Sequence, residues 1–179
     1  MKSVIGAFVA ALIFFVWQFL SWAAINLHSS YTGYTENQEE ILACLEGKLQ
    51  EGSYMLPNLP EGASEADYKA YQLERGGKPW AIVQYHNSMS VGMGMNLFRG
   101  FTTDLFAMGL LVWLFTFFRE TNLKTGLIAG LTIGFMGFLL TYYTQSIWFK
   151  TNVMGDLIDA VVPWSLSGLW LGWWLGRKN

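Results

Sequence analysis

The 179-residue chain is 53% hydrophobic and 17% aromatic, and only 13% of its residues are charged, whereas a soluble globular domain is about 45–50% apolar and about 25% charged. This composition excludes a disordered, collagen-like or coiled-coil chain and argues against a free cytosolic globule. A formal net charge of −2 lacks the basic excess typical of nucleic-acid binding. We therefore expect a protein of the lipid bilayer that binds no nucleic acid.

Four apolar runs are long enough, or nearly so, to cross about 30 Å of hydrocarbon as helices of about 20 residues. They lie at about 4–27, 98–118, 126–148 and 157–175. The first run is too long, and too bulky in its outer half, to be the core of a cleaved signal peptide. We interpret it as a retained helix. The predicted fold class is therefore membrane α-helical, with four transmembrane helices.

The segment between the first two helices has a different composition. It carries nine acidic and four basic residues, three of the four prolines and no long apolar run. Three regions are thus predicted: residues 1–27 as transmembrane helix 1, residues 28–97 as an extracytoplasmic cap, and residues 98–179 as transmembrane helices 2–4.

The cap is predicted to be a small α/β unit. Helices are expected over 35–50 and 64–73, because each segment begins with capping and acidic residues and ends at glycine. Short strands are expected over 53–56 and 79–85. The few apolar residues make a small core, so we expect the cap to rest on the membrane helices or on a partner. Cys44 is interpreted as a small buried hydrophobe, with an intermolecular disulfide or a lipid attachment as alternatives.

Lysine and arginine counts predict the orientation, because short cytoplasmic loops are rich in these residues. One side of the predicted bundle carries Lys2, Arg119, Lys124, Arg177 and Lys178. The other side carries Arg99, Lys150 and the four basic residues of the cap. We expect both termini to be cytoplasmic and the cap to be periplasmic, in a bacterial inner membrane. A eukaryotic endomembrane is the alternative location.

Glycine recurs at every fourth position in two predicted helices, which places the glycines on one face of each helix. These are Gly126, Gly130 and Gly134 in the third helix and Gly168, Gly172 and Gly176 in the fourth. Glycine lets backbones approach closely, as membrane helices require. We expect a tight antiparallel pair at the cytoplasmic side whose outer halves splay into an outward-facing wedge. Packing in a homo-oligomer or against another subunit is the alternative.

Polar side chains of the predicted spans collect at the outer end of the helices. Because charges are costly inside a bilayer, such side chains are candidate functional residues. The candidate polar site comprises Arg99, Thr103, Asp104, Tyr142, Tyr143, Gln145, Asp156 and Asp159. We expect Arg99 to pair with Asp159 or Asp104. A substrate, proton or lipid-headgroup site is one interpretation, and a salt bridge that pins helix ends, or snorkelling to headgroups, is the other.

A methionine-rich segment, HNSMSVGMGMN, precedes the second span. It offers His86, Met89, Met93 and Met95 as candidate metal ligands, because thioether and imidazole groups suit Cu(I). Flexible methionine packing is the structural alternative. No catalytic or nucleotide-binding motif such as GxSxG, HExxH, CxxC or a P-loop occurs in the sequence. We therefore predict no catalytic residue and no cofactor, and the sequence favours a protein that is not an enzyme.

The layout of the whole chain, with WQFLSW at 17–22, KPWA at 78–81 and GLWLGWW at 168–174, resembles that of uncharacterised four-span bacterial inner-membrane proteins. This resemblance implies no activity. We expect a non-enzymatic accessory or scaffolding subunit that binds a protein partner or forms a homo-oligomer. Small-molecule or lipid-headgroup binding in the wedge between helices 2, 3 and 4 is the alternative function, and periplasmic copper handling is a third.

Overall fold

The computed structural model describes residues 1–177, so Lys178, one of the basic residues used to predict the orientation, lies outside the described residues. The chain divides into two units. Unit 1 comprises Met1–Gly33 and the chain from Gly92 onward, and unit 2 comprises Tyr34–Val91. Residues 28–33 therefore belong with the helices of unit 1, although the sequence predicts them as part of the cap.

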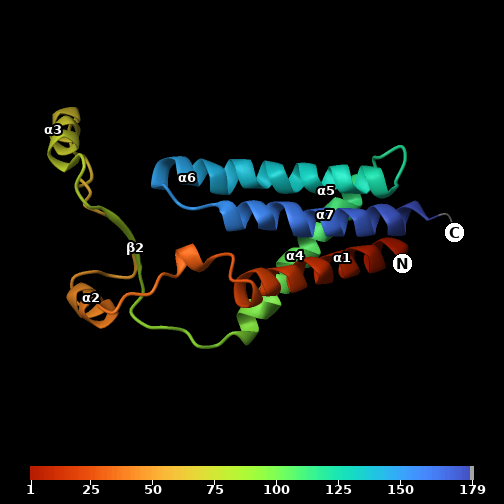
Figure 1. Cartoon of the computed structure of the whole chain (residues 1–179), viewed down its shortest axis with the longest axis horizontal. Helices are drawn as coiled ribbons and strands as arrows, with labels where there is room; N and C mark the ends of the chain where they lie inside the picture. The colour runs from red at the N-terminus through yellow and green to blue at the C-terminus, as the bar shows by residue number, and fades with distance from the viewer. Residues whose placement is uncertain (178–179) are drawn as a thin grey trace. The chain divides into compact units, whose positions relative to one another are not determined.

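Unit 1 is built from long helices that lie alongside one another (Figure 1). Its α-helices are α1 (Lys2–Phe19), α4 (Gly94–Phe115), α5 (Leu123–Phe138), α6 (Thr144–Phe149) and α7 (Met154–Gly176). Its shorter turns are the π-helical η1 (Leu20–Ala24) and η3 (Leu139–Tyr143) and the 3₁₀ turn η2 (Ser29–Tyr31). The π-helical turn η1 extends α1, and η3 joins α5 to α6, so two of the apolar helices continue without a break.

Three helices of the described chain are long and apolar enough to cross a membrane: Lys2–Ala24, Gly94–Phe115 and Leu123–Phe149. They coincide with the first three predicted runs and support a helical membrane protein. Helix α7 coincides with the fourth run and has 23 residues, but it is not among these candidates. Its composition is mixed, with four glycines, four tryptophans and two aspartates.

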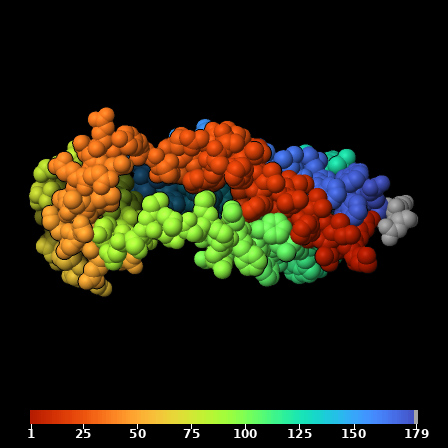
Figure 2. All heavy atoms as spheres, turned by 90° about the horizontal axis from the view of Figure 1, so that it is seen from below, coloured from red at the N-terminus to blue at the C-terminus, as the bar shows by residue number. Residues whose placement is uncertain are grey.

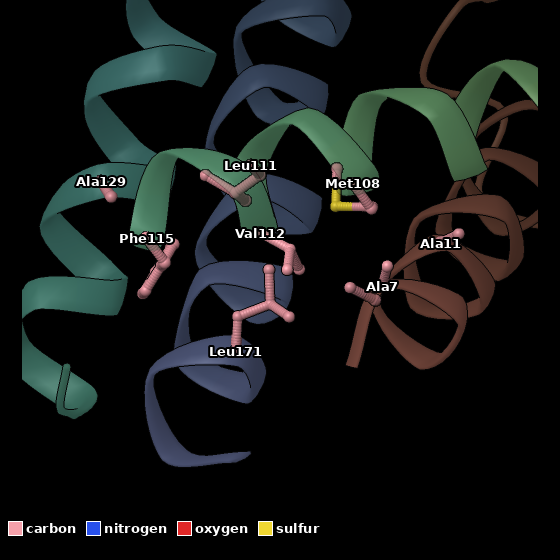
Figure 3. Close-up of a cluster of buried hydrophobic side chains, with 9 residues drawn as sticks. Ala7, Ala11, Met108, Leu111, Val112, Phe115, Ala129 and Leu171 are labelled. Carbon is pink, nitrogen blue, oxygen red and sulfur yellow. The ribbon is translucent and has the colours of Figure 1, made fainter. Parts of the chain in front are cut away.

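Helix α1 packs against both α4 and α7, and α5 packs against α7. In the space-filling view the red α1 and the green α4 run side by side (Figure 2). Small residues of α1, Ala7, Ala10 and Ala11, meet Met108 of α4 and Leu171 of α7 in a buried apolar cluster (Figure 3). Alanine suits these positions because a short side chain lets neighbouring helices come close.

Three side chains on one face of α7 donate hydrogen bonds to backbone carbonyls of α1. Ser167 Oγ donates to the carbonyl oxygen of Ala10 at 3.2 Å. Trp170 and Trp174 donate through Nε1 to the carbonyl oxygens of Gly6 and Lys2, at 3.0 and 2.9 Å. These polar groups of α7 are thus satisfied within the bundle.

The two sets of glycines meet in the interface between α5 and α7. A Cβ atom added at Gly126 would lie 2.2 Å from the carbonyl oxygen of Gly168, and one added at Gly134 would lie 2.0 Å from that of Ala160. No side chain fits at such distances. Because the contact reaches Ala160, the close approach extends further toward the start of α7 than the predicted cytoplasmic pairing with splayed outer halves. Only the first two turns of α7 lie beyond it.

Unit 2 combines two short helices with a two-stranded sheet. These elements are α2 (Gln38–Leu45), β1 (Gly52–Leu56), α3 (Glu65–Arg75) and β2 (Ala81–Tyr85). The strands are antiparallel, with Tyr54 opposite Val83, which confirms the small sheet of the predicted α/β cap. Helix α3 begins with a capping box in which Ser64 and Asp67 bond each other's backbone. Helix α2 is shorter than expected and ends before Gly47, where the backbone turns to a φ of +72°.

Unit 2 has almost no core. Within residues 34–91, only Tyr85 is buried. Cys44 is exposed, and its Sγ accepts a hydrogen bond of 3.5 Å from Lys48 Nζ. The interpretation of Cys44 as a buried hydrophobe is therefore wrong, because the unit encloses no apolar interior that could receive the thiol.

Candidate functional site

A cluster of polar side chains, of which Ser21, His28 and Asp156 are buried, joins the end of α1 to the start of α7. At its centre is the Asp159 carboxylate, which accepts hydrogen bonds at both oxygens. Oδ1 accepts from Ser21 Oγ at 2.7 Å and from Trp17 Nε1 at 2.9 Å. Oδ2 lies 2.8 Å from His28 Nε2. Because a carboxylate only accepts hydrogen bonds, this contact places a proton on Nε2.

His28 is held on every side. Only 3% of the residue is exposed. Its ring stacks on Trp22 with centroids 4.1 Å apart, and Tyr31 lies nearly parallel to it at 5.7 Å. A Cβ at Gly155 would lie 3.1 Å from the imidazole and 2.8 Å from the carbonyl oxygen of Leu27. The start of α7 therefore needs a residue without a side chain beside the ring.

The other ring nitrogen of His28 has no hydrogen-bond partner among residues 1–177. Nδ1 is buried and lies 3.9 Å from Asp156 Oδ1. The imidazole therefore lies between the carboxylates of Asp156 and Asp159.

Asp156 is also buried, and Tyr31 Oη donates a hydrogen bond to it. Partial burial of the phenol, this hydrogen bond and the neighbouring negative charge raise the pKa of Tyr31 to about 12. The chain after α1 is therefore tied to α7 twice, through His28 and through Tyr31.

Local backbone geometry explains how the chain returns to α7 after α1 ends. The π-helical turn η1 contains the fully buried Ser21, and such turns are frequent at functional sites. Asn26 then adopts a φ of +56°, a left-handed conformation that asparagine tolerates better than most residues. The reversal carries His28 back against the helices.

A second buried carboxylate lies on α4. Asp104 is 5% exposed, and its Oδ1 accepts a hydrogen bond of 3.1 Å from Gln18 Nε2 of α1. Its Oδ2 has no hydrogen-bond partner in the described part of the chain. Asp104 thus contacts α1 through a neutral amide, whereas the carboxylates of α7 face an imidazole.

The predicted pairing of Arg99 with Asp159 or Asp104 is wrong. Within the described residues, Arg99 is exposed and forms no ion pair. Thr103 donates a hydrogen bond to the backbone carbonyl of Arg99 within the same helix. The partner of the α7 carboxylates is His28 instead, a residue that the sequence places in the cap.

Of the predicted polar site, the structure brings together Asp156 and Asp159, and it places the phenol of Tyr142 within electrostatic reach of both carboxylates. Tyr142, Tyr143 and Gln145 are exposed. Sequence reasoning missed the partners of the two aspartates, which are Trp17, Ser21, His28 and Tyr31. A signal was present, because residues 17 and 21 share a face of one helix and residues 156 and 159 share a face of another.

The candidate copper ligands are divided between the two units. His86 and Met89 lie in unit 2, and Met93 and Met95 lie at the start of α4 in unit 1. All four are exposed. Among residues 1–177, no group of three His, Cys, Asp or Glu side chains is arranged to hold a metal ion. Copper binding through the methionines stays a prediction.

The contacts of the His28 cluster are suited to hold two segments of the chain together rather than to carry out a reaction, and we call this cluster the His28 clamp. Ser21 Oγ donates to Asp159, so it lacks the contact with an imidazole base that activates a serine nucleophile. Every donor of the cluster converges on carboxylates that are fixed to α7. The cluster is therefore suited to hold the chain after α1 in one position.

No protein-family model matches the sequence, and no curated protein or solved structure matches it either. The resemblance to four-span bacterial proteins consequently rests on the sequence layout. The three apolar helices support its coarser part, a helical membrane protein.

Proposed function

We propose that this protein is a non-enzymatic accessory or scaffolding subunit of a membrane complex. Unit 1 is its membrane anchor, and unit 2 binds a protein partner. The observation that carries the proposal is the exposure of apolar side chains in unit 2. Leu42 of α2 is 54% exposed and Ile82 of β2 is 46% exposed, although Tyr85 is the one buried residue within 34–91.

The energetics of unit 2 favour a partner. A domain of about 60 residues ordinarily buries about 60% of the surface of its unfolded chain. Each large apolar side chain left in water forgoes about 1.5–3 kcal/mol of burial free energy. Ile41, Leu42, Met55, Trp80 and Ile82 all remain more than two-fifths exposed. A partner that covered these side chains would supply the stabilisation that the unit does not generate itself.

The anchor is proposed to span the membrane four times, with α7 as the fourth span. A helix of 23 residues is about 35 Å long at about 1.5 Å per residue, which suffices for the hydrocarbon core. Its tryptophan N–H groups bond carbonyls of α1, and its glycines contact α5. Two apolar helices therefore accompany it, although its own composition is mixed.

Four spans bring both ends of the chain to one side of the membrane. The distribution of lysine and arginine then favours cytoplasmic termini and a periplasmic unit 2 in a bacterial inner membrane. The hydrogen bonds of His28 and Tyr31 fix the chain as far as Tyr31, three residues before unit 2 begins at Tyr34.

Site-specific photo-crosslinking in cells tests the proposal. A photoreactive amino acid at Leu42 or Ile82 should give one discrete crosslinked product containing the same protein from either position. The matched control is Lys69, an exposed residue of α3 that pairs with Glu65, where no such product is expected. Crosslinking that fails at both apolar positions, or is the same at Lys69, would contradict the proposal. A crosslinked product made of two copies of this chain would show that the partner of unit 2 is a second copy of the same protein.

A further inference from the structure

Unit 1 contains a cavity of about 900 Å³ between the end of α4 and the start of α5. Its walls include Leu114 and Phe118 on one side and Ile128 and Ile133 on the other. A smaller hollow of about 330 Å³ also borders Leu114 and Ile133, and reaches Trp164 of α7. Together they form an apolar groove, which we call the α4–α5 groove. Its volume lies in the range of small-ligand sites.

The groove exists because consecutive helices pack on different neighbours. Helix α4 packs on α1, and α5 packs on α7. The small Ala129 of α5 borders the cavity and belongs to the buried cluster together with Phe115 of α4 (Figure 3). The side chains of α4 and α5 therefore leave a groove between the two helices, and this groove is open to the surroundings.

The groove ends at two opposite charges. Arg119 and Glu120 border the cavity and lie in the connection between α4 and α5. Within residues 1–177, neither forms an ion pair. Both are exposed. A cation and an anion thus stand side by side where an apolar groove opens.

These charges lie at the depth of lipid headgroups. The connection falls between two candidate spans, Gly94–Phe115 and Leu123–Phe149, so it lies at a membrane surface. The wall residues Leu114, Ile128 and Ile133 belong to those spans and lie in the hydrocarbon. An acyl chain in the groove would consequently place its headgroup beside Arg119 and Glu120.

We propose that the α4–α5 groove binds a bilayer phospholipid with a phosphoethanolamine headgroup. Arg119 holds the phosphate, because a guanidinium matches the geometry of phosphate oxygens. Glu120 accepts hydrogen bonds from the primary ammonium, which carries three N–H donors. One acyl chain lies along Leu114, Ile128 and Ile133.

The headgroup chemistry separates this lipid from the other common ones. A phosphoglycerol headgroup has the phosphate but no cation for Glu120. A phosphocholine headgroup has a cation whose methyl groups leave no N–H to donate. Phosphoglycerol hydroxyls can donate only neutral hydrogen bonds to Glu120, so of the three headgroups only phosphoethanolamine offers this carboxylate a charged donor.

Lipid titration followed by native mass spectrometry tests the site. The full chain, stripped of lipid in detergent, is titrated with phosphatidylethanolamine, phosphatidylglycerol and phosphatidylcholine of identical acyl chains. Phosphatidylethanolamine should bind about tenfold more tightly than the others, as loss of one charged hydrogen bond predicts. Arg119→Gln should lower its affinity about tenfold, and Glu120→Gln should abolish the preference over phosphatidylcholine. Lys124→Gln is the matched control, because Lys124 lies nearby but outside the lining, and it should change nothing.

A second pair of variants tests the groove itself. Thr132 is an exposed lining residue of α5, and Met136 is an exposed residue of the same helix outside the lining. Thr132→Trp should lower the affinity for every lipid, whereas Met136→Trp should not, with thermal unfolding temperatures confirming that both variants fold. Equal wild-type affinity for the three lipids would overturn the proposal. Insensitivity to Arg119→Gln and Thr132→Trp would do the same.

Discussion

His28 is the residue on which the polar cluster of unit 1 depends. It bonds Asp159, faces Asp156 and stacks on Trp22. The sequence identifies the two aspartates as candidate site residues because charged residues in an apolar helix are conspicuous. It does not identify their partner, because arginine is the more obvious cation at a membrane entrance. A histidine beyond the end of the first apolar run becomes a partner only when Asn26 reverses the chain.

Removing the imidazole should weaken the fold of unit 1. His28→Ala leaves the partly buried carboxylate of Asp159 without one of its donors, which costs about 1–3 kcal/mol. Unfolding in detergent by increasing fractions of a denaturing detergent, followed by circular dichroism, measures the change. The matched control is His86→Ala, since His86 is exposed in unit 2, and its effect should stay within about 0.5 kcal/mol. Equal effects of the two variants would contradict the claim that His28 stabilises unit 1.

Tyr31 gives the cluster a signature in a pH titration. Its pKa of about 12 lies above the ordinary value of about 10, so the fold favours the neutral phenol. The stabilisation from this group is fully present below about pH 10 and is lost as the pH rises through about 12. Ultraviolet spectra of the wild type and of Tyr31→Phe are recorded across the pH range and subtracted. The difference should show one phenol ionising near pH 12. A difference spectrum that develops near the ordinary pKa of about 10 would show that the bond to Asp156 is absent.

At the scale of elements, the pairing of α5 with α7 illustrates what a sequence pattern can predict. Spacing of four puts glycines on one helix face, and two consecutive apolar runs joined by a short loop run in opposite directions. The pattern therefore predicts the antiparallel contact that α5 and α7 make. The π-helical turns η1 and η3 carry no such pattern, because their sequences, LSWAA and LLTYY, are ordinary for apolar helices. Their positions depend on contacts with other elements and could not be predicted.

Adding one methyl group to the α5–α7 contact should destabilise the bundle. In Gly130→Ala the new Cβ would lie 2.1 Å from the carbonyl oxygen of Trp164, so the helices must separate. A loss of about 1–3 kcal/mol is typical of such overpacking. Gly137→Ala is the matched control, because nothing lies within 4 Å of its added Cβ. It should raise stability by about 0.5–1 kcal/mol through helix propensity. If both variants destabilised the protein, the loss would come from alanine within α5 and not from the contact between α5 and α7.

At the scale of the whole molecule, the sequence predicts the division into apolar helices and a polar insert, because composition changes sharply between them. Helix α7, the proposed fourth span, illustrates the limit of composition. Helix α7 carries two tryptophans and one serine whose polar groups bond α1, and a residue-by-residue scale counts such groups as exposed. Its environment depends on tertiary contacts, which the order of residues does not reveal.

The orientation can be tested with the chain's single cysteine. Cys44 is exposed on α2 of unit 2, so a membrane-impermeant maleimide should label it in intact spheroplasts. The control is the double variant Cys44→Ser and Arg177→Cys, which should be labelled only after permeabilisation. The reversed pattern of labelling would place unit 2 in the cytoplasm.

The central claim is that unit 2 uses its exposed apolar side chains to bind a protein partner. Native mass spectrometry of the protein extracted in mild detergent tests it most directly, with Leu42→Glu compared against Lys69→Glu. We expect the wild type and Lys69→Glu to retain a stoichiometric protein subunit beyond the 20.3 kDa of this chain, and Leu42→Glu to lose it. A wild-type protein that is a stable monomer carrying only lipid would contradict the account.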